Sequence, residues 1–165
     1  MPVITANVIG GAGENLTALR LEKDGYFKVY FLGEKAPIED FLVEILDENH
    51  PYQCLLQVKA TSQDDCYLEN GNIITPVPED KLNKLVHRPL PTYVVGADNE
   101  REVVYIAPAF NESRQYPSIP TGFRLDNNDK ASRIANLEKF RDDIIRYWKE
   151  SNIIDFKNNK FKSAL

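Results

Sequence analysis

Three residues in the first half of the chain have side chains and a spacing suited to phosphodiester chemistry. Asp40 opens an apolar stretch, and Gln57 and Lys59 lie two residues apart in the next one. Residues two apart in a strand point to the same face, so the Gln57 and Lys59 side chains project together. If the two stretches pair as antiparallel strands, as their short connection indicates, Asp40 lies near that pair. Such groups inside an apolar sheet are costly unless they satisfy one another or serve a function.

These side chains are of the types that a metal-dependent hydrolase of phosphodiesters needs. The Asp40 carboxylate and the side-chain carbonyl of Gln57 are hard oxygen ligands for Mg²⁺ or Mn²⁺. A bound divalent ion lowers the pKa of a water ligand and neutralises charge on the phosphate. Lys59 would orient the attacking water or stabilise the developing charge. Glu14, further upstream, offers a second carboxylate to the ion, directly or through a water molecule.

The elements that must position these residues follow from the pattern of apolar residues. Residues 14–25 are predicted to form an amphipathic helix that Gly25 ends, with an apolar stripe made of Leu16, Ala18, Leu19, Leu21 and the stem of Lys23. The glycine-rich run 10–13 lacks the lysine and hydroxyl residue of a phosphate loop, so we interpret it as the entry to this helix. Strands at 27–32, 40–46 and 52–61 are expected to follow as a buried meander.

The second half of the chain continues the alternation of helices and strands. Residues 62–75 are polar and are expected to form a loop or a sheet edge. The predicted elements after them are a helix at 78–86, a hairpin of strands 92–96 and 102–107, a loop at 111–128 and a helix at 129–150. The stripe of the last helix is expected to be core, with a dimer contact as the alternative; it consists of Ile134, Leu137, Phe140, Ile144, Tyr147 and Trp148. This mixed order predicts an α/β fold with helices on the faces of a central sheet.

Length and composition indicate the number of domains, the classes of partner and the cellular location. A chain of 165 residues with 42% hydrophobic and 27% charged residues is typical of one globular domain, here residues 1–150, with a basic tail at 151–165. The net charge of −5 counts against a protein that simply coats DNA, although it leaves room for an enzyme with a local basic face. Cys54 and Cys66 show no metal-binding pattern, and Cys54 is expected in the core. With no signal peptide and no membrane-spanning run in the sequence, a cytoplasmic location is expected.

The ordered set of residues resembles the DUF4365 family. The resemblance covers roughly residues 11–108 and lies in Gly13-Glu14, Leu21, Gly25-Tyr26, Asp40, the run Gln57-Val58-Lys59-Ala60-Thr61 and the strand at 91–96. That family belongs with the PD-(D/E)XK nuclease superfamily, which includes restriction endonucleases and Holliday-junction resolvases. The resemblance implies a restriction-endonuclease-like mixed sheet of about five strands flanked by helices.

The resemblance also implies an activity and a site. It implies metal-dependent hydrolysis of DNA, with defence against foreign DNA as a candidate role. Glu14, Asp40 and Gln57 would then be the metal ligands and Lys59 the catalytic lysine. The chain departs from the superfamily at two positions: Glu39 replaces proline before Asp40, and Gln57 replaces an acid, as in Mrr-type restriction enzymes. The loss of one negative charge weakens metal affinity. Glu44, on the same strand face as Asp40, is a candidate to compensate.

Two other functions stay open at this point. A catalytically inactive member of the same fold would serve as a binding or assembly module, which the glutamine at position 57 and the acidic net charge favour. A small acidic partner protein would have no site at all, and Glu14, Asp40 and Lys59 would then be scattered in space. A homodimer or a larger partner protein that supplies DNA binding also stays open, as does a phosphate contact from the lysines of the tail.

Overall fold

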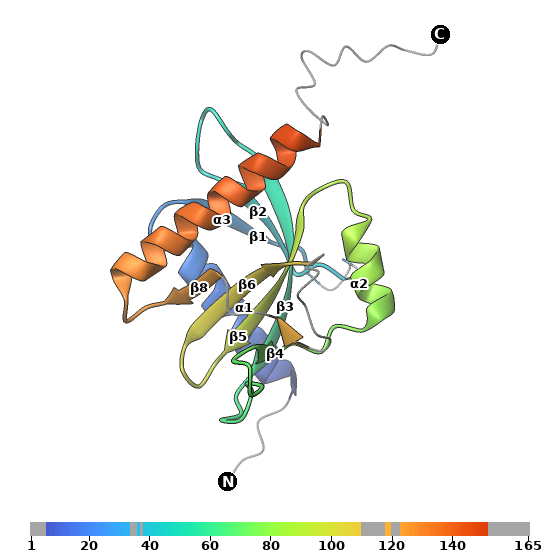
Figure 1. Cartoon of the computed structure of the whole chain (residues 1–165), viewed down its shortest axis with the longest axis vertical. Coiled ribbons are helices and arrows are strands. Elements are labelled where there is room, and N and C mark those ends of the chain that lie inside the picture. Colours follow the sequence, from blue (N-terminus) through green and yellow to red (C-terminus); the bar gives the residue numbers. More distant parts are fainter. Residues whose placement is uncertain (1–5, 34–35, 37, 110–117, 120–122, 152–165) are drawn as a thin grey trace.

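The computed structural model has an α/β architecture, as expected from the sequence (Figure 1). It describes residues 6–33, 36, 38–109, 118–119 and 123–151. The helices in this part are α1 (Ala6–Glu22), α2 (Glu79–Val86) and α3 (Lys130–Glu150). The strands are β1 (Phe27–Phe31), β2 (Phe41–Ile45), β3 (Gln53–Thr61), β4 (Ile73–Ile74), β5 (Thr92–Asp98), β6 (Val103–Pro108), β7 (Ser118–Ile119) and β8 (Phe123–Asp126).

Six of these strands form one mixed sheet in the order β1-β2-β3-β5-β6-β8. The predicted meander and hairpin are confirmed, because β1, β2 and β3 pair antiparallel and so do β5 and β6. The two groups join through parallel pairing of β3 with β5. Leu56 is the last residue of β3 that has a partner in β2, namely Phe41, whereas residues 57–61 continue beside β5 alone. Over these five residues, the edge of β3 that faces β2 is therefore open to side chains from other elements.

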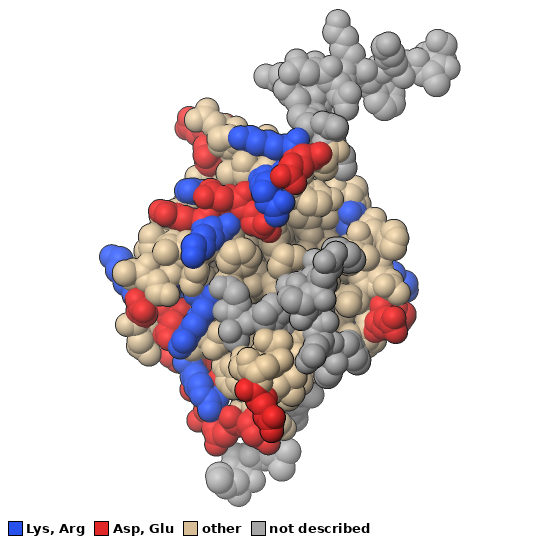
Figure 2. Space-filling model, viewed as in Figure 1, with Lys and Arg blue, Asp and Glu red and all other residues tan. Residues whose placement is uncertain are grey.

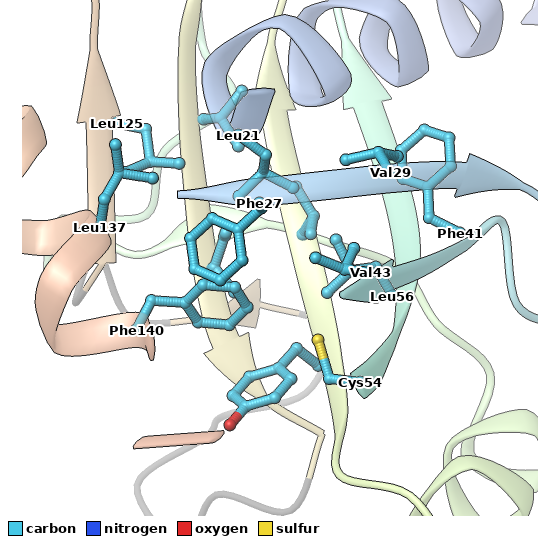
Figure 3. Close-up of a cluster of buried hydrophobic side chains, with 14 of the residues drawn as sticks. Leu21, Phe27, Val29, Phe41, Val43, Cys54, Leu56, Leu125, Leu137 and Phe140 are labelled. Atoms are coloured by element: carbon cyan, nitrogen blue, oxygen red, sulfur yellow. The ribbon is translucent and has the colours of Figure 1, made fainter. Parts of the chain in front are cut away.

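A hydrophobic layer covers each face of the sheet, and Figure 1 shows α3 and α2 on opposite sides. The first layer joins α1 and α3 to the sheet, with Phe27 and Phe140 in ring contact at 5.2 Å between centroids (Figure 3). Leu137, Phe140 and Ile144 of α3 are fully buried, which confirms the core role predicted for this stripe. The second layer is covered by α2 and β4, whose buried residues include Leu85 and Ile73.

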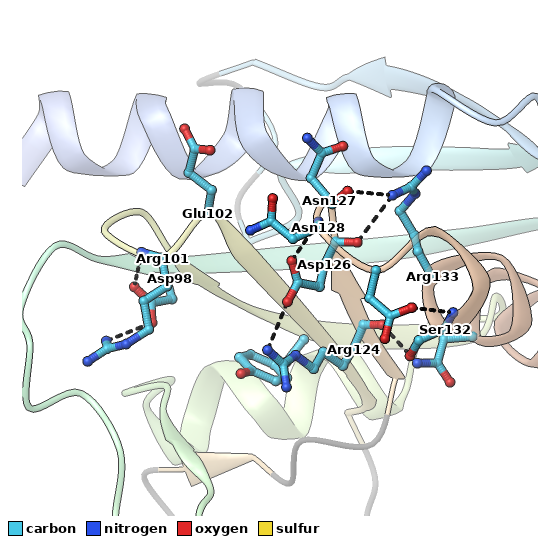
Figure 4. A network of polar contacts seen from close by, with 12 residues as sticks. Asp98, Arg101, Glu102, Arg124, Asp126, Asn127, Asn128, Ser132 and Arg133 are labelled. Atoms are coloured by element: carbon cyan, nitrogen blue, oxygen red, sulfur yellow. Dashed lines mark hydrogen bonds and ion pairs between the residues drawn. The ribbon is translucent and has the colours of Figure 1, made fainter.

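The start of α3 is fixed by polar contacts with the turn before it (Figure 4). Asp129 precedes the helix, as predicted, and its side chain accepts a hydrogen bond from the Ser132 amide at 3.1 Å. The buried Arg133 donates from Nη1 to the backbone carbonyls of Asp126 and Asn127 at 3.2 and 3.1 Å. These contacts satisfy carbonyl groups that the end of β8 would otherwise leave without partners. They hold α3 in register with the sheet.

The first helix differs from the prediction in its start and in its buried face. It begins at Ala6, so the glycine run at 10–13 lies inside the helix and is not its entry. Leu21 is fully buried, and Leu16 and Ala18 pack partly buried against the core, as predicted. Leu19 is 62% exposed and Lys23 is exposed, whereas Gly13 and Thr17, outside the predicted stripe, are buried. A Cβ atom added at Gly13 would fall far inside contact distance of the Ala60 side chain on β3. The helix therefore lies so close to the sheet at Gly13 that only a residue without a side chain fits there.

The segment predicted as a loop at 111–128 contains strand structure. β8 pairs antiparallel with β6 and becomes a sixth strand, and β7 pairs with β4 in a separate two-stranded sheet. β4 confirms the edge expected within 62–75. Asn127 and Asn128 form a turn after β8, whereas residues 111–117 and 120–122 of the predicted loop and the basic tail beyond Ser151 lie outside the described residues.

Two further predictions concern the cysteines and the membrane. Both cysteines are free thiols, and Cys54 is fully buried in the first layer, as expected. Burial raises the pKa of the Cys54 thiol, which makes it inert as a nucleophile. No helix among the described residues has the length and apolar character needed to cross a bilayer.

Two glycine substitutions test the close packing of α1. Gly13→Ala should lower the free energy of unfolding by about 1–2 kcal/mol, because overpacking at Ala60 outweighs the higher helix propensity of alanine. Gly10→Ala is the matched control, since a Cβ atom there meets nothing within 4 Å, and it should stabilise by about 0.5–1 kcal/mol. Urea unfolding measures both. A Gly13→Ala variant as stable as Gly10→Ala would contradict the close contact.

Candidate active site

Asp40 lies at the open edge of β3, immediately before β2 begins. Its backbone N–H donates to the Leu56 carbonyl at 2.9 Å, which continues the pairing of β2 with β3 by one step. Its Oδ2 atom then accepts hydrogen bonds from the Val58 amide at 2.7 Å and from Gln57 Nε2 at 3.0 Å. The carboxylate thus occupies the place where a longer β2 would have offered a carbonyl to Val58. The expected approach of Asp40 to Gln57 is confirmed.

Glu14 reaches the same point from α1. Its neighbour Gly13 packs against Ala60, so the helix backbone beside Glu14 lies close to the end of β3. The Glu14 and Asp40 side chains share a hydrogen bond. Two carboxyl groups form such a bond only when one of them carries a proton, so we infer from this contact that the pair shares a proton.

The environment of this pair favours the protonated form. Burial raises the pKa of Glu14, and the Asp40 charge and the shared hydrogen bond raise it further. Burial also raises the pKa of Asp40, against the opposing effects of the Val58 amide, the bond with Glu14 and the Lys59 charge. The pair therefore gives up its last proton at a higher pH than isolated carboxyl groups do.

Lys59 completes the group from the same strand as Gln57. The two residues occupy alternate positions on β3, and the positive charge of Lys59 is close enough to lower the pKa of Asp40. The four residues predicted from the sequence are thus brought together from α1, the start of β2, and β3. The scattered arrangement expected for a partner protein without a site does not occur.

Glu44 does not belong to this group, and its predicted compensating role is wrong. It lies on β2 opposite Lys28 and Gln53, and its carboxylate accepts a hydrogen bond from Gln53 Nε2 at 2.8 Å. Four residues along a strand separate it from Asp40, which corresponds to about 13 Å. The alternation of strand residues correctly places both acids on one face, but it does not bring them within reach of one ion.

One ion pair beside the site was not predicted. Glu39 is only 6% exposed, and its carboxylate accepts a hydrogen bond from Arg88 Nε. The two residues are 49 positions apart, so no local pattern connects them. The only signal available was an acidic residue directly before Asp40.

The donor atoms at the site fit a small divalent cation. Glu14 and Asp40 offer carboxylate oxygens and Gln57 offers an amide oxygen, which are the ligand types that Mg²⁺ and Mn²⁺ prefer. No group of three or more His, Cys, Asp or Glu side chains suited to a metal occurs in the described part of the chain. In the present arrangement Gln57 turns its Nε2 toward Asp40. Ligation by Oε1 requires a half-turn of that amide.

A separate apolar cavity lies on the outer side of α1. Its volume is about 680 Å³ and its lining includes Leu19, Phe31 and Arg20. None of the four residues of the candidate site contributes to it. The candidate site is therefore separate from this cavity.

Comparison of the chain with protein-family models, curated proteins and solved structures found no match. The function is therefore inferred from the geometry of the site.

The proton shared by Glu14 and Asp40 predicts how stability depends on pH. Because the pKa of Glu14 is raised on folding, its contribution to stability is complete below the ordinary carboxyl pKa and is lost as pH rises through the raised value. Glu14→Gln has no proton to lose there, so its Tm should rise relative to that of the wild type as the pH increases above the ordinary carboxyl pKa. For a chain of this size, each kcal/mol corresponds to about 2–4 °C in Tm.

Glu44→Gln is the matched control for this measurement, because the Glu44 carboxylate faces the Gln53 amide. Thermal unfolding followed by circular dichroism across the pH range gives all three curves. A constant difference in Tm between Glu14→Gln and the wild type would contradict the shared proton.

Proposed function

We propose that this protein is a metal-dependent nuclease that hydrolyses DNA phosphodiester bonds. The observation that carries the proposal is the convergence of the Glu14 and Asp40 carboxyl groups with Gln57 and Lys59 at the open edge of β3. Membership of the DUF4365 family and the restriction-endonuclease-like fold belong to the same proposal. They are supported by the order of the four residues along the chain and by the mixed sheet with helices on both faces.

Each of the four residues has a distinct role in the proposed reaction. Glu14 and Asp40 would hold Mg²⁺ or Mn²⁺, with the Gln57 carbonyl as a weaker third ligand. The bound ion supplies charge neutralisation at the phosphate and an acidified water molecule. The hydrogen bond from the Val58 amide fixes the Asp40 carboxylate, so that its second oxygen has a defined direction. Lys59 donates hydrogen bonds to the attacking water or to a phosphate oxygen, where negative charge develops.

The surface charge constrains how a nucleic acid would bind. The chain carries a net charge of −5, and Figure 2 shows acidic and basic side chains interleaved on the visible face. The overall electrostatic field of the protein therefore contributes little free energy to the binding of a polyanion. Binding would depend on the divalent cation and on a few local cations such as Lys59, or on DNA contacts supplied by a partner protein.

A second candidate function is a binding or assembly module without catalysis. It is favoured by the contact of Gln57 Nε2 with Asp40 Oδ2, because this contact satisfies the carboxylate without any cation. In this case the same polar group holds α1, β2 and β3 together. The two candidate functions share one geometry and differ in whether a divalent ion displaces the shared proton.

Cleavage assays test the first candidate. Purified protein should cut at least one of duplex, single-stranded or branched DNA in the presence of Mg²⁺ or Mn²⁺. Asp40→Ala and Lys59→Ala should each lower the rate by on the order of 10²–10³-fold, as expected for the loss of a ligand or of a charge-stabilising donor. Glu44→Gln should cut like the wild type. Absence of cleavage on all three substrates, or equal rates in Asp40→Ala and the wild type, would reject the nuclease.

Metal titration separates the two candidates. Calorimetry should detect Mn²⁺ binding that disappears in Asp40→Asn, a variant that keeps an oxygen for the Val58 amide but removes the charge. Since the ion replaces a proton, the affinity should increase as pH rises through the raised pKa of the pair, with proton release to the buffer. If wild-type protein binds neither Mn²⁺ nor Mg²⁺ at any pH where it is folded, the assembly module becomes the better proposal.

A further inference from the structure

The turn that presents Asp40 is anchored at each of its last three residues. Ile38 is buried in the second hydrophobic layer together with Leu85 of α2. Glu39 is paired with Arg88, and the Asp40 amide donates to Leu56. Of these anchors, the ion pair is the one that places a buried charge directly beside the candidate site.

The backbone of Arg88 is held in place at the end of α2. Arg88 follows α2, and its own backbone N–H donates to the carbonyl of the fully buried Leu85 at 3.1 Å. Its side chain is 35% exposed, whereas that of Glu39 is 6% exposed. The pair thus connects the end of α2 to the residue before Asp40. Because Glu39 is almost fully removed from water, its charge depends on Arg88 for compensation.

We propose that Arg88 is a positioning residue for the candidate site: by compensating the buried charge of Glu39, it keeps in place the turn that directs the Asp40 carboxylate to the edge of β3. Without Arg88, an unpaired buried carboxylate would remain next to the Glu14–Asp40 pair, and the turn would move to hydrate it. The Asp40 carboxylate would then lose its defined contact with the Val58 amide. The consequence for metal affinity rests on the proposed function, whereas the consequence for the turn does not.

The Val58 amide is a direct reporter, because its N–H donates to Asp40 Oδ2 at 2.7 Å. In Arg88→Gln, amide hydrogen exchange measured by NMR should be about tenfold or more faster at Val58 than in the wild type. Exchange at Val95 and Ile106, buried in the centre of the sheet, should change much less. Mn²⁺ affinity should fall by about 10–100-fold, the range for loss of a group that orients a metal ligand.

A second substitution at Glu39 distinguishes a positioning role of Arg88 from a general contribution to stability. The double variant Glu39→Gln with Arg88→Gln removes the unpaired charge and should return Val58 exchange to within about threefold of the wild type. Arg124→Gln is the matched control, since it breaks an ion pair with Asp126 on β8 and should leave both readouts unchanged.

Two results would overturn the positioning role. One is equal acceleration of exchange at Val58, Val95 and Ile106 in Arg88→Gln, which is the pattern of a merely structural contact. The other is a double variant as defective at Val58 as the single one. Failure of the proposed function has a different signature: the wild type would bind no Mn²⁺, while Val58 exchange would still respond to Arg88→Gln and to its rescue.

Discussion

The close approach of α1 to β3 at Gly13 is the contact on which the candidate site depends. Gly13 meets Ala60 and Ala97, so three small residues let the helix backbone lie almost against the sheet. This short separation brings the Glu14 carboxyl group to the end of β3. Asp40 reaches the same place from the other direction, because β2 begins only after it. A larger residue at position 13 would lift the helix and separate the two carboxyl groups.

The rest of the fold supplies the stability and rigidity that this arrangement needs. Two partly buried carboxyl groups in contact are unfavourable once both are ionised. The surrounding sheet has a hydrophobic layer on each face, and β3 lies in its interior between β2 and β5. The polar group is therefore attached to a rigid part of the molecule, which is the usual requirement for a precise site. The unfavourable electrostatics are confined to one edge.

The part of the site that lies on neighbouring strands was predictable from the sequence. Alternation places Gln57 and Lys59 on one face, and the short connection between β2 and β3 fixes their register against Asp40. Glu44 shows the limit of that reasoning, because alternation identifies the face but not the distance along the strand. The stripe predicted for α1 was right for Leu16, Ala18 and Leu21, which lie in or against the core, but wrong for Leu19 and Lys23, which are exposed. Hydrophobicity favours Leu19, whereas close packing against β3 selects the glycine.

Other features depend on contacts between distant parts of the chain. Arg88 and Glu39 are 49 residues apart, and no sequence pattern connects the two. β8 lies in a segment rich in proline, asparagine and glycine, which predicts a loop. The four residues of β8 form a strand because β6 offers them unpaired backbone groups at the edge of the sheet. Such partners exist only after the rest of the sheet has formed.

Gln57 determines how the two candidate functions relate to each other. A carboxylate at this position would place a third acid beside Asp40 and Glu14, and the fold would then need a cation to hold the group together. The Gln57 amide instead donates to Asp40, so the site is satisfied when only a proton lies between the acids. A divalent ion must displace that proton and turn the amide, which lowers its affinity relative to a site with three carboxylates. Lys59 opposes this loss, because its charge lowers the pKa of Asp40 and so favours the ionised form that a metal ion requires.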